Sequence, residues 1–233
     1  SKLTELLKNR NEINKENFIM NISEAEFAIE CQDISFKYFN SEVYIFDNLT
    51  LNIAKNKHTI LTGANGSGKS TLLGLLSGVY YSESGKVIVN SEKFGYIGAT
   101  PLIFSASLRE NLMYGYDEQV TDEMMLNELR NFDTFKEQSG YDLDRVIDNK
   151  SLSSGQMQKI AFIRALISNV DILLLDESTA NLDDSSRDLI FDILEKKQIT
   201  IINSTHDADQ FKNVDHHINI DIIEEDRILE NKF

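Results

Sequence analysis

Cysteine is nearly absent from this sequence, and patterns that would cross-link the chain or anchor it in a membrane are missing. Cys31 is the one cysteine in 233 residues, so no disulfide can form within the chain. The sequence has no Cys/His group with metal-ligand spacing, and both observations favour a reducing compartment. No stretch approaches the roughly 18 consecutive apolar residues that a membrane span needs, and the N-terminus lacks the apolar core of a signal peptide. We therefore expect the chain to be soluble by itself.

Positive charge is also scarce. The chain carries 23 Lys and Arg against 38 Asp and Glu, a formal net charge of −15. The basic footprint that nucleic-acid-binding proteins present to phosphates is therefore missing, and we expect no nucleic-acid partner. The acidic excess favours a well solvated surface. Because 41% of the residues are hydrophobic, the length suits one compact domain or two tightly joined lobes.

Apolar patterning divides the chain into regions. Residues 1–28 are rich in Asn, Glu and Lys, and we interpret them as a leader or connector before a folded domain at 29–233. Strand-like runs lead into a helical segment at about 105–166, where apolar residues recur three or four positions apart. Beyond it, short apolar runs alternate with helical patterns. The alternation predicts an α/β fold with a parallel sheet covered on both faces and an inserted helical lobe.

A phosphate-binding loop is the first motif with chemical content. The stretch GANGSGKST fits the pattern G-x-x-x-x-G-K-[ST] and lies between a strand-like and a helical run, as that pattern requires. The alternative is a glycine-rich turn without a ligand. Backbone N–H groups of such a loop, together with the positive end of the next helix, bind phosphate oxygens. We expect Lys69 to reach the β- and γ-phosphates and the Ser70 hydroxyl to ligate Mg²⁺. The predicted ATP-binding residues are Gly63, Ala64, Asn65, Gly66, Ser67, Gly68, Lys69, Ser70 and Thr71.

Two other apolar runs end at candidate catalytic side chains. DILLLDE ends at Asp176 and Glu177, and His206 follows TIINST. Because ligands of open α/β sheets bind at the carboxyl ends of the strands, we expect these side chains to lie beside the phosphate loop. Asp176 is the predicted Mg²⁺ holder, and Glu177 the acceptor of a proton from an attacking water. The alternatives are an ordinary loop start and a structural histidine; we interpret three other histidines as structural, namely His58, His216 and His217.

The motif LSSGQ at 152–156, taken with the phosphate loop, resembles the signature sequence of ATP-binding cassette (ABC) proteins, usually written LSGGQ. The resemblance covers about 31–228 and implies a nucleotide-binding domain of an exporter-like half-transporter. The fold that it implies is a P-loop NTPase (RecA-like) parallel-sheet core with an N-terminal antiparallel β subdomain and an inserted α-helical subdomain. In that family two domains pair head to tail, and each signature seals the ATP of the other. The residues expected to act on a partner's ATP are Ser153, Ser154, Gly155 and Gln156.

The resemblance assigns further residues one at a time. Tyr38 matches the aromatic residue that stacks on adenine; the alternative is an ordinary strand aromatic. Asp183 matches the aspartate of the D-loop, and His206 the switch histidine that contacts the γ-phosphate. Two positions depart from the family pattern: Ser154 replaces a glycine of the signature, and Ala99 stands where the Q-loop glutamine touches Mg²⁺ and the attacking water. An alanine methyl can do neither, which puts the hydrolysis rate in question.

Three functions follow as expectations. The first is an ATPase that uses ATP and Mg²⁺ to drive export, with residues 1–28 continuing from a transmembrane domain in the same polypeptide, at the cytoplasmic face of a membrane. The second is a soluble ABC ATPase acting on nucleic acid or ribosomes, which the net charge of −15 opposes. The third is a nucleotide-binding module whose hydrolysis is impaired by Ala99. The sequence leaves open the substrate and whether the working pair is a homodimer or a heterodimer.

Overall fold

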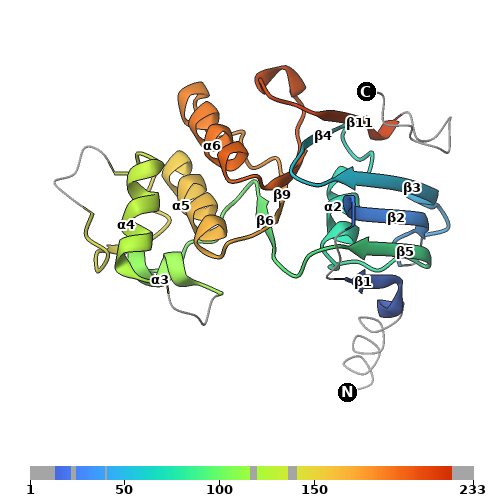
Figure 1. Cartoon of the computed structure of the whole chain (residues 1–233), viewed down its shortest axis with the longest axis horizontal. Helices are drawn as coiled ribbons and strands as arrows, with labels where there is room; N and C mark the ends of the chain where they lie inside the picture. The colour runs from blue at the N-terminus through green and yellow to red at the C-terminus, as the bar shows by residue number, and fades with distance from the viewer. Residues whose placement is uncertain (1–13, 22–24, 40, 116–119, 136–140, 222–233) are drawn as a thin grey trace.

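The computed structural model describes residues 14–21, 25–39, 41–115, 120–135 and 141–221. A four-stranded sheet, a five-stranded sheet, a small two-stranded sheet and several helices make up this part of the chain (Figure 1). The four-stranded sheet and the group formed by α3, α4 and α5 lie at opposite ends of the view, and strands β6 and β9 lie between them. No helix in the described ranges is long and apolar enough to cross a membrane.

The first sheet has the strand order β1-β5-β2-β3. Strand β2 is antiparallel to both β3 and β5, as the antiparallel subdomain implied. Strand β1 is parallel to β5, and it falls within residues 1–28, which we expected to be a connector. The folded part therefore begins earlier than residue 29, while residues 1–13 lie outside the described part. The bounds are β1 Phe18–Met20, β2 Phe27–Phe36, β3 Phe46–Ala54 and β5 Ser84–Val89, after a 3₁₀ turn η1 at Lys15–Asn17.

The second sheet is the predicted parallel sheet, and it is confirmed. Its strand order is β11-β4-β10-β9-β6, and every neighbouring pair runs parallel. Every residue of the central strand β10 is buried, and β9 is apolar up to its last residue, because both faces of these strands are covered. The bounds are β4 His58–Thr62, β6 Phe94–Gly98, β9 Ile172–Asp176, β10 Thr200–Ser204 and β11 His216–Asn219.

Helices cover both faces of this parallel sheet. Leu173 and Leu175 of β9 belong to the core shared with α5 and α6, whereas Ile172 and Leu174 belong to the core shared with α2 and the antiparallel sheet. This division follows from the alternation of side chains along a strand. Each leucine buried in this way contributes about 1.5–3 kcal/mol to folding. The bounds are α2 Lys69–Leu76, α5 Ser154–Ile167 and α6 Asp184–Lys196.

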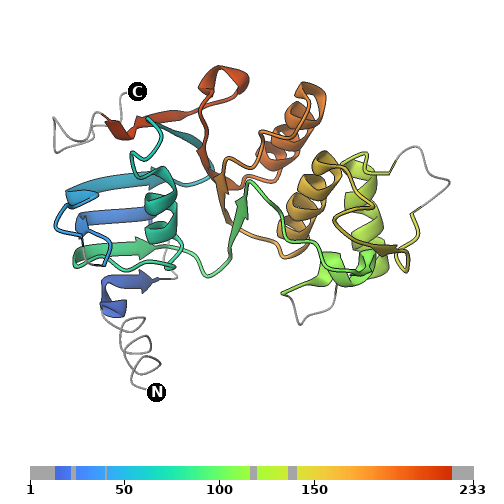
Figure 2. The ribbon, with the colours of Figure 1, turned by 180° about the vertical axis from the view of Figure 1, so that it is seen from behind.

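A group of helices lies between β6 and β9 in the sequence. Helices α3 and α4 pack on α5, and two short strands, β7 and β8, pair antiparallel beside them. Seen from behind, the lobe is again at the opposite end from the antiparallel sheet (Figure 2). The bounds are β7 Ala106–Ser107, α3 Leu108–Met113, α4 Asp122–Asn131 and β8 Val146–Ile147; a second 3₁₀ turn, η2, spans Ala208–Gln210.

Candidate functional site

The phosphate-type loop joins the carboxyl end of β4 to the first residue of α2, as predicted. Gly63 and Gly68 have φ of 149° and 102°, in the region that favours glycine. A Cβ atom at Gly63 would lie 2.6 Å from Ser67 Oγ, so the turn also requires a residue without a side chain at this position. Lys69 curls back and donates from Nζ to the carbonyl oxygens of Gly63 (2.8 Å) and Ala64 (2.9 Å). The buried lysine thus closes the loop on itself.

The structure brings together Ser70 and Asp176, the two predicted Mg²⁺ residues. Ser70 Oγ at the start of α2 donates to Asp176 Oδ1 at the end of β9, at 3.1 Å. A third group, which we did not predict, completes this contact: the Tyr96 hydroxyl donates to Asp176 Oδ2 at 2.8 Å. Burial, reinforced by the Asp176 carboxylate, raises the pKa of Tyr96, so this phenol stays a donor. The hydroxyl and carboxylate oxygens of Ser70 and Asp176 are the donors that Mg²⁺ prefers, and the site therefore fits this ion.

Glu177 and His206 also meet at this edge of the sheet. Glu177 Oε1 lies 2.7 Å from His206 Nε2, and both side chains remain partly exposed. The contact arises because β9 and β10 are parallel neighbours, so that the residues following them leave the sheet at the same end. Glu177 itself is left-handed, with φ of 52°, and its N–H donates to the Ser204 carbonyl at 3.0 Å. The arrangement places a carboxylate and an imidazole, both open to solvent, next to the Ser70–Asp176 pair.

Tyr38 lies against the first turn of α2. Its hydroxyl is 2.6 Å from Thr71 Oγ1, and its ring stands edge-on to the rings of Phe36 (5.2 Å) and Tyr80 (5.8 Å). The residue remains 42% exposed although its ring packs against two other aromatic rings. The position agrees with a residue beside the nucleotide, while the stacking role stays a prediction.

The signature residues form the start of α5. Ser153 is the N-cap: its Oγ accepts from the Gln156 N–H (3.2 Å), and Gln156 Oε1 accepts from the Ser153 N–H (2.9 Å). This reciprocal capping box fixes the start of a 14-residue helix. Strands β6 and β9 separate α5 from α2 in both views of the fold. The structure therefore does not bring the signature together with the phosphate loop of the same chain.

Ala99 is exposed just beyond β6, and its backbone is held by a residue that we did not predict. Gln158 of α5 is fully buried and donates from Nε2 to the Ala99 carbonyl (2.9 Å) and more weakly to that of Gly98 (3.4 Å). Its Oε1 has no partner among the described residues. A glutamine on the apolar side of α5 was the available signal, although its target could not be read from the sequence.

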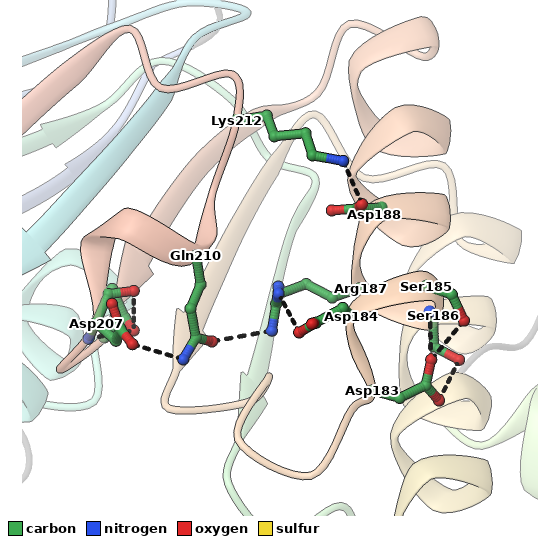
Figure 3. Close-up of polar contacts among 10 residues, drawn as sticks. Asp183, Asp184, Ser185, Ser186, Arg187, Asp188, Asp207, Gln210 and Lys212 are labelled. Atoms are coloured by element: carbon green, nitrogen blue, oxygen red, sulfur yellow. Dashed lines mark hydrogen bonds and ion pairs between the residues drawn. The ribbon is translucent and has the colours of Figure 1, made fainter.

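Asp183 caps α6 within its own chain. Its carboxylate accepts from Ser185 Oγ (2.6 Å), the Ser186 N–H (2.8 Å) and Ser186 Oγ (2.9 Å), as Figure 3 shows. These hydrogen bonds hold the pKa of Asp183 well below its usual value. The carboxylate is thereby fixed and ionised at neutral pH.

Further along α6, a polar chain connects the helix to the loop after His206. The Arg187 guanidinium donates to Asp184 (2.7 Å) and to Gln210 Oε1 (2.9 Å), and Gln210 Nε2 donates to Asp207 (2.7 Å; Figure 3). Asp207 directly follows His206 in the sequence, so α6 restrains the loop that carries the histidine.

Residues 46–180 match the ABC transporter family. The ATP-dependent permease MDL1 of Candida albicans is 32% identical over 219 residues, covering 84% of this chain and 32% of the permease. ATP-binding cassette sub-family B member 10, mitochondrial, of Mus musculus is 33% identical over 207 residues, covering 80% of this chain and 29% of that protein. The chain thus spans about a third of the length of these relatives.

The fold also resembles a solved structure. A bacterial Atm1-family ABC exporter with ATP bound superposes with a TM-score of 0.75, covering 89% of this chain and 41% of that chain. The two sequences are 19% identical, so this likeness bears on the fold alone.

Proposed function

This chain belongs to the ABC transporter family, and from that premise we propose that it binds ATP with Mg²⁺ and hydrolyses it to drive export across a membrane. The observation that carries the proposal is the 2.7 Å contact of Glu177 with His206, beside Ser70 and Asp176 and at the sheet edge that the phosphate loop also occupies. One edge therefore gathers the groups that bind phosphate, hold a divalent cation and position a water. This is the composition that phosphoryl transfer to water requires.

The roles of the side chains follow from their positions. Lys69 exchanges its two loop carbonyls for phosphate oxygens when the nucleotide binds. Ser70 and Asp176 would hold Mg²⁺, which when bound neutralises charge on the phosphates. Glu177 accepts or orients the proton of the attacking water, and His206 holds the Glu177 carboxylate in place. Tyr38, which is 42% exposed, would stack on the base.

The working unit that we propose is a head-to-tail dimer. The first turn of α5 leaves N–H groups that no intrahelical acceptor satisfies, and the helix adds its positive end. Since this turn does not meet the phosphate loop of its own chain, it would seal the ATP of a second copy or of a related chain. The relatives are longer than this chain, which supports a transmembrane domain in the same full-length polypeptide and a position at the cytoplasmic face of a membrane.

Phosphate release and ATP binding test the proposal. The purified chain should release phosphate from MgATP, with specific activity rising with protein concentration because two chains complete each site. Lys69→Ala should lose most ATP affinity in an equilibrium titration, since the ammonium group that pairs with the phosphates is gone. Lys57→Ala is the matched control, because Lys57 forms an exposed pair with Asp215 at the opposite edge of the sheet. If Lys69→Ala kept its ATP affinity, residues 63–71 would not be the phosphate-binding loop.

Ala99 favours a second candidate, a nucleotide-binding module with little turnover. A methyl group cannot take the place of an amide that orients a water. The Ala99 side chain is exposed, so it is not packed against a neighbouring side chain. ATP binding at normal affinity with no phosphate release, even at high protein concentration, would favour this candidate over the ATPase.

A further inference from the structure

The Asp176 carboxylate is held through both of its oxygens. Ser70 donates to Oδ1 (3.1 Å) and Tyr96 donates to Oδ2 (2.8 Å). Two donors on different oxygens define the plane of a carboxylate, whereas one donor leaves it free to rotate. The Tyr96 contact is therefore the part of this arrangement that sets the direction of Asp176 independently of Ser70.

The register of β6 with β9 brings Tyr96 to this contact. Strand β6 pairs with β9 so that Gly98 lies opposite Asp176 and Tyr96 opposite Leu174. Side chains two residues apart lie on the same face of a strand, so Tyr96 and Asp176 lie on the same face of the sheet. A Cβ atom at Gly98 would lie 3.6 Å from Tyr96 Cε1, an ordinary van der Waals distance, so the contact depends on this register and not on glycine at position 98.

The hydroxyl, rather than the ring, is the anchored part of Tyr96. The residue is 49% exposed, so the ring contributes little to the core, yet its hydroxyl forms a charge-assisted hydrogen bond. The same strand leads directly to Ala99, whose side chain has no polar atom to offer. On the β6 side, a polar contact with the residues of the cation site is thus made by the phenol at position 96.

We propose that Tyr96 is a positioning residue of the Mg²⁺ site, which orients the Asp176 carboxylate from β6 in a chain that has alanine at position 99. The inference rests on the proposed function. In this role Tyr96 acts through Asp176, as groups that hydrogen-bond to metal-binding carboxylates do.

Tyr96→Phe tests this role, because it removes the hydroxyl and keeps the half-exposed ring. The Kd of a fluorescent ATP analogue is measured once with excess Mg²⁺ and once with EDTA. We expect the Kd with Mg²⁺ to rise about 10-fold, the lower end of the effect for partners that orient metal ligands, and the Kd with EDTA to stay unchanged. The thermal unfolding midpoint should also stay at the wild-type value.

Tyr114→Phe is the matched control. Tyr114 is also half-exposed (50%), but it follows α3 in the helical lobe, so loss of its hydroxyl should leave both Kd values unchanged. Equal Kd values for Tyr96→Phe and wild type with Mg²⁺ would overturn the inference, and so would an equal rise with and without Mg²⁺, which indicates a structural role. A wild-type chain that does not bind the analogue at all would instead contradict the proposed function.

Discussion

Replacing Glu177 by Gln exchanges one carboxylate oxygen for an amide group and leaves the size of the side chain unchanged. The residue directly follows β9, and its Oε1 lies 2.7 Å from His206 Nε2. An amide can still form a hydrogen bond with the imidazole, but it cannot accept a proton from water. The substitution therefore separates the chemical role of Glu177 from its role in shaping the loop.

The expected effect on turnover is large and the expected effect on stability small. Removing a positioned general base costs roughly 10²- to 10⁴-fold in rate, or about 3 to 5 kcal/mol of barrier. The Glu177–His206 pair is partly exposed, at 41% and 47%, and pairs of this kind contribute about 0 to 1 kcal/mol to stability. The variant should therefore fold, bind ATP normally and accumulate the ATP-bound form.

Phosphate release at saturating MgATP and an equilibrium titration with ATP measure the two quantities separately. Glu195→Gln is the matched control, since Glu195 of α6 accepts from Asn213 at 2.8 Å and lies away from the carboxyl edge of the sheet. We expect wild-type turnover for this control. If Glu177→Gln turned over within a few-fold of the wild type, Glu177 would not be the base, and the reasoning from the sheet edge would fail.

Three further outcomes are expected. Ala99→Gln should raise ATP turnover severalfold, because position 99 is exposed and accommodates a longer side chain; unchanged phosphate release would indicate that another group already positions the water. Asp183→Ala should lower the free energy of unfolding, measured in urea, by about 1 kcal/mol, because the α6 cap is lost. Since hydrogen bonds lower the pKa of Asp183 in the folded state, this contribution is present above about pH 4 and is lost as the pH falls. A difference between wild type and variant that stayed the same at pH 2 to 3 would contradict this. His58→Phe should reduce the loss of unfolding free energy between about pH 7 and 5. Burial, only partly opposed by the Asn213 carbonyl and nearby carboxylates, lowers the pKa of His58, so the unfolded chain binds the proton first and the wild type loses stability below about pH 6.5. Equal pH slopes of the two proteins in urea unfolding would show that this imidazole does not contribute.

Short segments with an apolar centre were enough to predict the parallel strands. HTILT, ILLLD and TIINS each have such a centre, and they form three adjacent strands of the parallel sheet. The glycines and lysine of GANGSGKST form the predicted turn before α2. By contrast, Phe18–Met20 is only three residues long and lies in the stretch that we interpret as a connector; its pairing with β5 depends on residues far along the chain.

The residue types around the candidate site were determined by the sequence alone: a lysine and hydroxyls after the glycine turn, an acidic pair after β9 and a histidine after β10. Only the tertiary structure decided which of them touch. The 2.7 Å contact of Glu177 with His206 depends on the parallel register of β9 with β10. The hydrogen bond from Tyr96 to Asp176 depends in the same way on the register of β6 with β9. Register is a property of paired strands, and a hydrogen bond requires it within a few tenths of an ångström, which no single stretch of sequence specifies.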